Sequence, residues 1–261
     1  MKNHSSPFQA KRSGFTLVET VIAMGIITIM ITAFLAAFGP AVQGIRKSIS
    51  AKEANRLASS LEYEMSILRD DSTGIGDSKY PTAFAKAFFW IKNSVNDSKD
   101  DYVLIYQYRG DPSAARTDGT LKIYNGKDGV PGKDYVLQSV VRRMGVNGTW
   151  DRRRIEQELA PGVVEGRVFY VRMKQLIFNN GVLELTTEHG KILDPYGTHD
   201  EAATHEDYPE AVIAFQAEFY VLKSSIYGYV NGAFNLTDDN NDGHPDATGK
   251  PVFTRNLAVR R

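Results

Sequence analysis

A run of apolar, small and hydroxyl residues extends from Phe15 to Phe38 and contains one charged side chain, Glu19. At 1.5 Å per residue, about 24 residues make a helix roughly 36 Å long, which is enough to cross a bilayer. An ionised carboxylate at the centre of a membrane helix is unfavourable by roughly 2.5–3.5 kcal/mol. We therefore expect Glu19 to lie at an interface or to have a partner of opposite charge.

The segment before this run, residues 1–14, carries Lys2, Lys11 and Arg12. Positive charge on this side predicts a cytoplasmic N-terminus and a translocated C-terminal part. A cleaved secretory signal normally has an apolar region of about 7–15 residues, shorter than this one and without an internal charge. A generic signal-anchor explains the length and the orientation of the run, but it does not explain Glu19.

The stretch "KRSGFTLVE", residues 11–19, resembles the class III signal of type IV pilins and type II secretion pseudopilins. That signal has a basic leader, a glycine, a phenylalanine, three further residues, a glutamate and then a membrane helix. The resemblance covers residues 1 to about 40. It implies that a prepilin peptidase cuts between Gly14 and Phe15 and that the new Phe15 amine is methylated.

The resemblance also implies that Glu19 pairs with the N-terminal amine of a neighbouring subunit. An amine and a carboxylate that are buried together offset each other's loss of hydration, whereas either group alone is strongly unfavourable. Glu19 is then an assembly device. The alternative, a glutamate that reaches up to the lipid headgroups, stays open at this point.

The same resemblance implies a structural subunit in the bacterial inner membrane, with a single span, a cytoplasmic N-terminus and a periplasmic or otherwise extracytoplasmic globular domain. Its partners are prepilin peptidase and other pilin-like subunits, which it meets through the N-terminal helix. The length of 261 residues is long for a major subunit of this family and favours a minor component. We expect it to belong to a type II secretion pseudopilus. The alternatives are a minor type IV pilin or tip adhesin, and a membrane-tethered binding or enzymatic domain.

Composition narrows the function classes further. The chain has 31 basic and 31 acidic residues, so its zero formal charge gives no reason to expect a nucleic-acid partner. It has no cysteine, which removes disulfides and thiol nucleophiles. The sequence contains no Walker loop, G-x-S-x-G or G-x-G-x-x-G motif. We therefore expect a protein that is not an enzyme.

The apolar pattern changes after Gly39-Pro40, where apolar residues recur at helical spacing with charged residues between them. This predicts a helix that kinks or pauses at the proline and then runs to about Arg69. The expected class is α+β, with the long helix packed on an antiparallel, β-rich domain. The expected organisation is a leader at 1–14, a transmembrane and assembly helix at 15–38, its amphipathic continuation at 39–69 and a globular domain at 70–261. The apolar positions after the proline are Val42, Ile45, Ile49, Leu57, Leu61, Met65 and Leu68.

Within the globular domain, a turn-rich break at 70–81 precedes a predicted short helix at 82–95. A second short helix is expected within 150–162, where Arg152, Arg153 and Arg154 have acidic neighbours and are expected to face solvent. Aromatic and branched residues between turn signals predict the strands. These lie at 102–108, 121–124, 135–141, 168–178, 182–187, 212–222, 226–234 and 252–259.

The stretch "DDNNDGHPD" contains the pattern D-x-N-x-D-G-x-x-D over residues 238–246. Oxygen donors at alternate positions of a tight loop can converge on Ca²⁺ at about 2.3–2.6 Å. The pattern resembles EF-hand and thrombospondin-type calcium loops, but Gly249 stands where an EF-hand has a bidentate glutamate, so any affinity is expected to be modest. An Asx-rich surface turn is the alternative. The candidate ligands are Asp238, Asn240, Asp242, the backbone carbonyl of His244, and Asp246.

Overall fold

The structure is a computed structural model in which the chain divides into two compact units after Ser48, the second being Ile49–Arg261. The residues that the structure describes are 16–69, 79–94, 98–126, 128–145, 150–179, 181–186, 191–195, 200–233 and 250–261.

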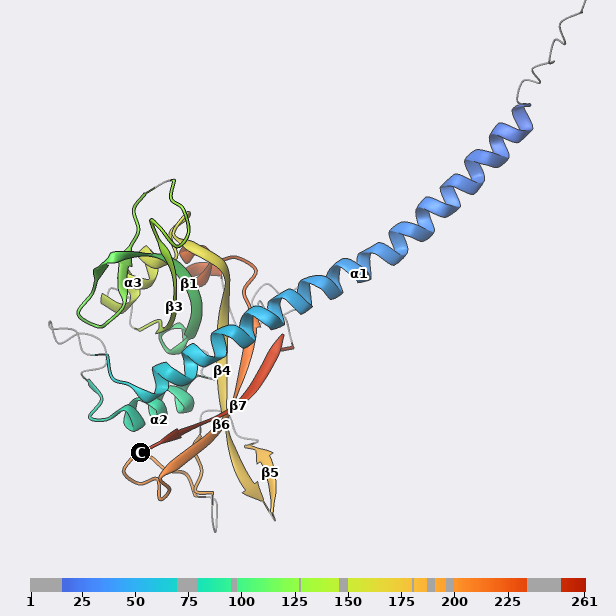
Figure 1. Cartoon of the computed structure of the whole chain (residues 1–261). Coiled ribbons are helices and arrows are strands. Elements are labelled where there is room, and N and C mark those ends of the chain that lie inside the picture. Colours follow the sequence, from blue (N-terminus) through green and yellow to red (C-terminus); the bar gives the residue numbers. More distant parts are fainter. Residues whose placement is uncertain are drawn as a thin grey trace, which may run out of the picture. The chain divides into compact units, whose positions relative to one another are not determined.

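Helix α1 (Leu17–Ser66) is a single helix of 50 residues that continues through Gly39 and Pro40 (Figure 1). Its buried side chains begin only at Ser50 and recur at intervals of three or four residues, which is the spacing of one helical face. The last four turns of α1 are therefore part of the core of the second unit. The buried positions are Ser50, Ala54, Leu57, Ala58, Leu61, Glu64 and Met65.

The second unit is built on one antiparallel sheet, which confirms the expected α+β class. The strands run in the order β2-β1-β4-β6-β7, while β3 pairs with β1 and β5 pairs with β4. All of these pairings are antiparallel. The strands are β1 (Val103–Ala115), β2 (Leu121–Ile123), β3 (Val136–Arg143), β4 (Val164–Asn179), β5 (Val182–Leu185), β6 (Val212–Val221) and β7 (Phe253–Arg260).

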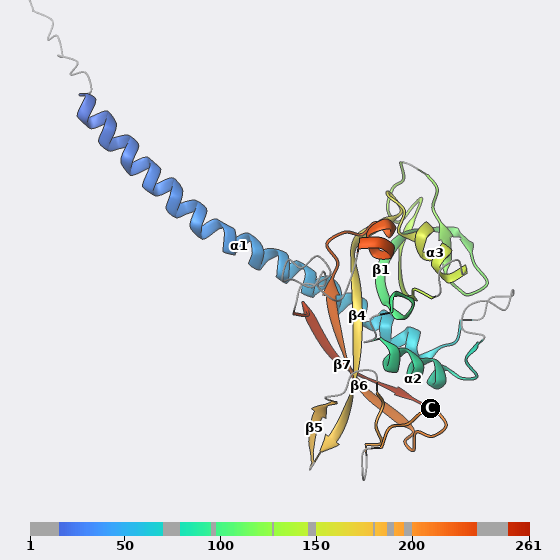
Figure 2. The same cartoon turned by 180° about the vertical axis from the view of Figure 1, so that it is seen from behind.

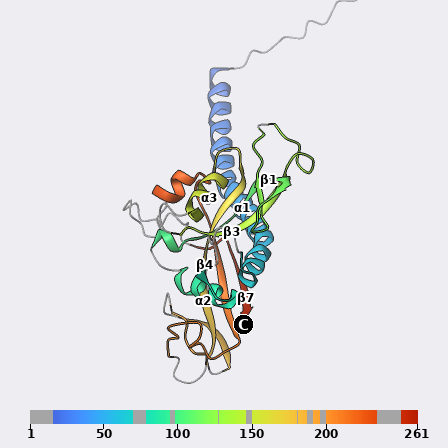
Figure 3. The same cartoon turned by 90° about the vertical axis from the view of Figure 1, so that its left-hand side faces the viewer.

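Helices cover both faces of this sheet and enclose two apolar clusters. On one face, the C-terminal turns of α1 and helix α2 (Ala83–Asn93) pack on side chains such as Phe169 and Phe215. On the other face, helix α3 (Trp150–Glu158) and the π-helical turn η3 (Tyr229–Ala233) pack on Tyr106 and Tyr170. Figure 2 shows η3 beside α3, and Figure 3 shows α3 and the end of α1 on opposite sides of β3. Alternation along the strands produces this division, because successive side chains point to opposite faces.

The predicted strand at 226–234 is wrong, because this segment forms the turn η3. The backbone N–H groups of Tyr229 and Val230 both donate to the carbonyl of Ile226, at 3.0 Å and 3.3 Å. Val230 then lies fully buried in the second apolar cluster. Ile226 and Val230 are four residues apart, which is a helical spacing, and the glycines between and after them weaken a strand.

The predicted solvated face of α3 is also wrong for two of its three arginines. Arg152 is buried and donates to the carboxylate of Asp100 at 2.7 Å, and Arg154 is buried against the carboxylate of Asp118. Only Arg153 of the three is exposed. The acidic partners lie at least 36 residues away in sequence, so the acidic neighbours within the helix gave the wrong indication.

Candidate functional site

Glu19 forms a reciprocal cap with Thr16 at the start of α1. The backbone N–H and the hydroxyl of Thr16 both donate to Glu19 Oε2, at 2.8 Å and 2.9 Å, and the N–H of Glu19 donates back to Thr16 Oγ1 at 3.3 Å. This is the arrangement of a capping box. An acidic group in the first turn also interacts favourably with the positive end of the helix dipole.

The cap gives the carboxylate of Glu19 two hydrogen-bond donors within its own chain. The side chain is therefore partly satisfied before any neighbour arrives. Sequence reasoning singled out Glu19 but missed Thr16, although the pattern T-x-x-E at the start of an apolar run is a known N-terminal signature. The predicted processing residues Gly14 and Phe15 lie outside the described residues, so the structure places neither of them relative to Glu19.

The first two-thirds of α1 presents an apolar surface. Large side chains from Leu17 to Phe38 are more than half exposed or nearly so, and the most apolar window of the helix has no buried residue. In the described part of the chain, α1 is the helix with the length and composition to cross a membrane. Because no described residue covers this surface, it needs either lipid or other apolar helices around it.

The hydroxyl groups in this apolar stretch bond to the helix itself. Thr28 donates to the carbonyl of Met24 at 2.8 Å, and Thr32 donates to the carbonyl of Thr28 at 2.8 Å. Polar groups in hydrocarbon are tolerated when the protein satisfies them, since no water is present to do so. The two threonines therefore do not prevent this part of α1 from entering a bilayer or a helical bundle.

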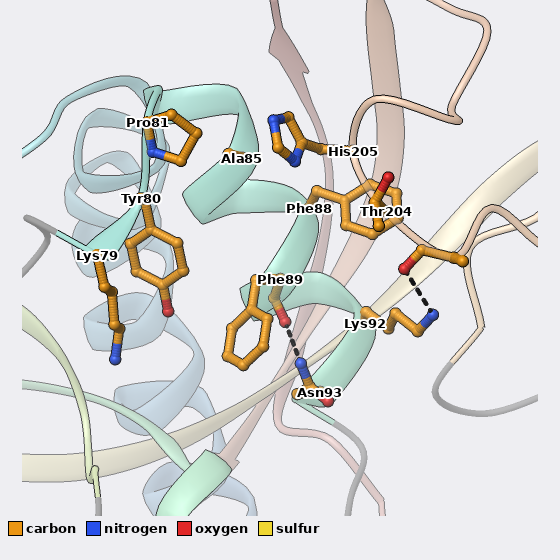
Figure 4. A pocket seen from close by; sticks show the side chains of 11 residues that line it. Lys79, Tyr80, Pro81, Ala85, Phe88, Phe89, Lys92, Asn93, Thr204 and His205 are labelled. Atoms are coloured by element: carbon orange, nitrogen blue, oxygen red, sulfur yellow. Dashed lines mark hydrogen bonds between the residues drawn. The ribbon is translucent and has the colours of Figure 1, made fainter.

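A separate hollow of about 500 Å³ lies in the second unit, between α2 and residues 203–205 (Figure 4). Its walls include the rings of Tyr80, Phe88 and Phe89. Lys92 on its rim is held by Glu201 at 3.0 Å and by the carbonyls of Ala202 and Ala203. Apolar and aromatic side chains make up much of this lining, so the hollow is suited to holding an apolar group.

The calcium-loop residues Asp238, Asn240, Asp242, His244 and Asp246 all lie outside the described residues. Within the part of the chain that the structure describes, no group of three or more histidine, aspartate or glutamate side chains is arranged to hold a metal ion. The calcium site therefore stays a prediction from the sequence.

The family model of the prokaryotic N-terminal methylation motif matches residues 9–35. The matched segment includes Gly14, Phe15 and Glu19, so the chain carries a type IV pilin-like prepilin signal. The motif implies processing by a prepilin peptidase, anchoring in a membrane and assembly with other pilin subunits, and the α+β fold with its long N-terminal helix is consistent with a pilin. Together they indicate a structural subunit. Comparison with the curated proteins and with the solved structures gave no match.

Proposed function

We propose that this chain is a minor subunit of a type II secretion pseudopilus. Prepilin peptidase removes residues 1–14 on the cytoplasmic side of the inner membrane, and the mature chain begins at Phe15. The subunit is held by a single membrane span until α1 leaves the bilayer and joins a bundle of other subunits' helices. The globular domain remains on the extracytoplasmic side throughout.

The observation that carries this proposal is the position of Glu19. It lies at the start of an exposed apolar helix, inside a matched methylation motif, and its carboxylate is held by a local cap. Such a cap can open and be replaced, because the hydrogen bonds of Thr16 are made within one exposed turn. A partner's Phe15 amine adds an opposite charge, which favours the ionised carboxylate more strongly than neutral donors do.

The apolar surface of α1 supports the same proposal. The side chains before Ser50 take no part in the core of the second unit, so they are available to lipid first and to neighbouring helices afterwards. In an apolar environment, helices associate through close packing and through polar contacts that would otherwise be unsatisfied. The Glu19–amine pair would then fix the register between neighbouring helices.

The test compares Glu19→Gln with Glu62→Gln, a carboxylate on the exposed side of the same helix. Both proteins should insert into membranes, while only Glu19→Gln should be lost from purified pseudopili, by roughly tenfold or more if the pair contributes about 1.4 kcal/mol or more. Intact-mass measurement should show wild-type subunits that begin at a methylated Phe15. Equal incorporation of both variants would exclude Glu19 as the assembly residue.

A minor type IV pilin or a tip adhesin would have the same motif and the same helix. Recovery of the wild-type subunit from type IV pili, and not from pseudopili, would assign it to that system. A membrane-tethered domain would be recovered from neither filament and would remain in the inner membrane whatever residue stands at position 19.

A further inference from the structure

Strand β3 forms one edge of the sheet in the described part of the chain. It pairs with β1 from Val136 to Arg143, and no other described strand pairs with it. The N–H of Met144 donates to the carbonyl of Tyr102 at 2.9 Å. Because backbone groups alternate in an antiparallel pair, the even-numbered residues of β3 bond to β1. The odd-numbered residues, Leu137, Ser139 and Val141, therefore direct their N–H and C=O groups away from the sheet.

A groove of about 380 Å³ runs along this edge, between β3 and helix α1. It is lined by Ser59, Ser60 and Tyr63 of α1 and by the consecutive residues 138–141 of β3. Since successive side chains of a strand point to opposite faces, contact with four consecutive residues places the groove at the strand's edge and not on one face of the sheet.

One acceptor on this edge already holds a substitute donor. The side-chain amide of Gln138 folds back onto the carbonyl of Ser139 at 3.1 Å, where a neighbouring strand would supply a backbone N–H. The hydroxyl of Ser139 accepts a hydrogen bond from Gln107 Nε2 at 2.7 Å. An unpaired strand edge is a template for another strand, because its backbone groups need partners.

The charged groups beside the groove are already paired with each other. Glu64 accepts hydrogen bonds from Arg69 at 2.6 Å and from the buried Lys86 at 2.9 Å. A charged side chain entering the groove would disturb these pairs, whereas a hydroxyl could bond to Ser59 or Ser60. The lining therefore favours small, uncharged side chains that can donate and accept hydrogen bonds.

We propose that this α1–β3 groove binds an extended segment of a different polypeptide, which adds to β3 as a further strand and points serine or threonine side chains at α1. Main-chain hydrogen bonds supply the affinity in this mode, and the lining of the groove selects the alternate side chains. A second copy of this chain fits poorly. Its edge strand β7 contains Arg255 and Arg260, and β5 presents exposed apolar residues.

The probe is an end-blocked peptide of alternating threonine and valine, added at millimolar concentration to the full chain in detergent micelles. Amide exchange is followed by nuclear magnetic resonance. Before addition, Leu137, Ser139 and Val141 should exchange much faster than Gln138 and Val140. The peptide should slow exchange of the odd-numbered set by about tenfold or more.

Two control peptides carry N-methyl groups on all threonines or on all valines. A strand directs only alternate amides at its neighbour, so one of the two should bind and the other should not. Ser60→Trp fills the groove from a half-buried position of α1 and should abolish protection while leaving the slow exchange of Gln138 and Val140 unchanged. Ser139→Pro removes one N–H that points away from the sheet and should also abolish protection by the peptide. The strand should persist, since proline is tolerated on an edge strand where the N–H does not bond to the neighbouring strand.

Four results would overturn the proposal. The first is protection of all five amides in the free chain at every dilution, because the groove would then be filled by the chain's own residues. The second is protection of all five amides that is lost on dilution, with sedimentation showing a dimer. The third is an absence of protection by the peptide, and the fourth is equal binding of both N-methylated controls.

Discussion

Glu158, at the end of α3, accepts two hydrogen bonds from the guanidinium of Arg142 on β3, at 3.1 Å and 3.0 Å. Arg116 donates to the same carboxylate at 2.7 Å and the Tyr106 hydroxyl donates to it at 2.8 Å. Glu158 has no exposed surface. Burial acts to raise the pKa of Glu158, but Arg142 and Arg116 outweigh it, so the pKa lies below the usual range and the group stays ionised.

Glu158→Gln should destabilise the second unit by about 3–5 kcal/mol, because it leaves the buried guanidinium of Arg142 and the half-buried one of Arg116 without their shared carboxylate. The measurement is urea unfolding of a fragment that begins at Val42 and so retains every buried residue of α1. Glu156→Gln, on the exposed side of the same helix, is the control and should change stability by less than about 0.5 kcal/mol. Equal effects of the two substitutions would show that the Glu158 cluster adds nothing to stability.

Acid should weaken the same region through Asp118. Burial raises the pKa of this carboxyl, but the hydroxyl and N–H of Thr120 and the guanidinium of Arg154 lower it from 3.8 to about 2. The unfolded chain therefore binds the proton first, so the contribution of Asp118 is complete above about pH 5 and is lost as pH falls toward 2. It amounts to about 2 kcal/mol.

Asp118→Asn should flatten the stability profile of the same fragment between pH 5 and pH 2 by about that amount. Asp128→Asn, in an exposed turn, is the matched control and should leave the slope as in the wild type. A slope unchanged by Asp118→Asn would assign the acid sensitivity to other carboxylates.

Gly14→Val should block removal of the leader, since the peptidase signal combines the basic segment, this glycine and the apolar run. Membrane insertion should remain, because the apolar run is intact. Intact-mass analysis of membrane-extracted protein should find Met1–Gly14 lost from the wild type and retained in the variant. Wild-type protein that keeps residues 1–14 in assembled filaments would contradict the processing prediction.

Thr16→Val should loosen the start of α1, because it removes the hydroxyl that both donates to Glu19 and accepts its N–H. Loss of such a cap weakens a helix start by about 0.5–2 kcal/mol. Amide exchange in micelles should be faster at Glu19 in Thr16→Val and unchanged in Thr16→Ser, which keeps a hydroxyl. The same rate in both variants would mean that the cap does not persist in micelles.

Millimolar Ca²⁺ should raise the melting temperature of the fragment that begins at Val42, relative to the same fragment in chelator. The reason is that the ion is expected to bind the 238–246 loop of the folded fragment. A ligand that binds only the folded state stabilises it by about 2.7 kcal/mol at a hundredfold excess over Kd. Mg²⁺ should substitute poorly, since it prefers a smaller octahedral shell, and Asp242→Ala should erase the difference. Superimposable melting curves after metal has been stripped would reduce the motif to an acidic turn.

Local patterns predicted most of the architecture. The apolar spacing predicted for α1 is confirmed at Leu57, Leu61 and Met65, which are buried, whereas Ile45, Ile49 and Leu68 of the same pattern are exposed. The predicted strand at 212–222 is confirmed by β6. The Thr16 cap was within reach of the same reasoning, because its partner is three residues away.

The errors in α3 came from partners that are distant in sequence, whereas the error at 226–234 came from a helical spacing within the segment itself. Arg154 reads as a surface charge until the connection between β1 and β2 brings Asp118 against it. The sequence could not predict the groove beside β3 either. The groove depends on which strand lies at the edge of the sheet and on where α1 packs beside it. No periodicity within 136–143 carries that information.

The cluster around Glu158 also has a consequence for the order in which β1, β3 and α3 are expected to fold. It joins β1, the connection after it, β3 and α3 through single side chains, namely Tyr106, Arg116, Arg142 and Glu158. If β1 and β3 paired in a chain still lacking α3, Arg116 and Arg142 would lie close together without the carboxylate of Glu158 that they share. A nascent chain therefore gains little stability by pairing β1 with β3 before α3 is complete, and the segment from 103 to 158 should fold cooperatively once α3 has formed.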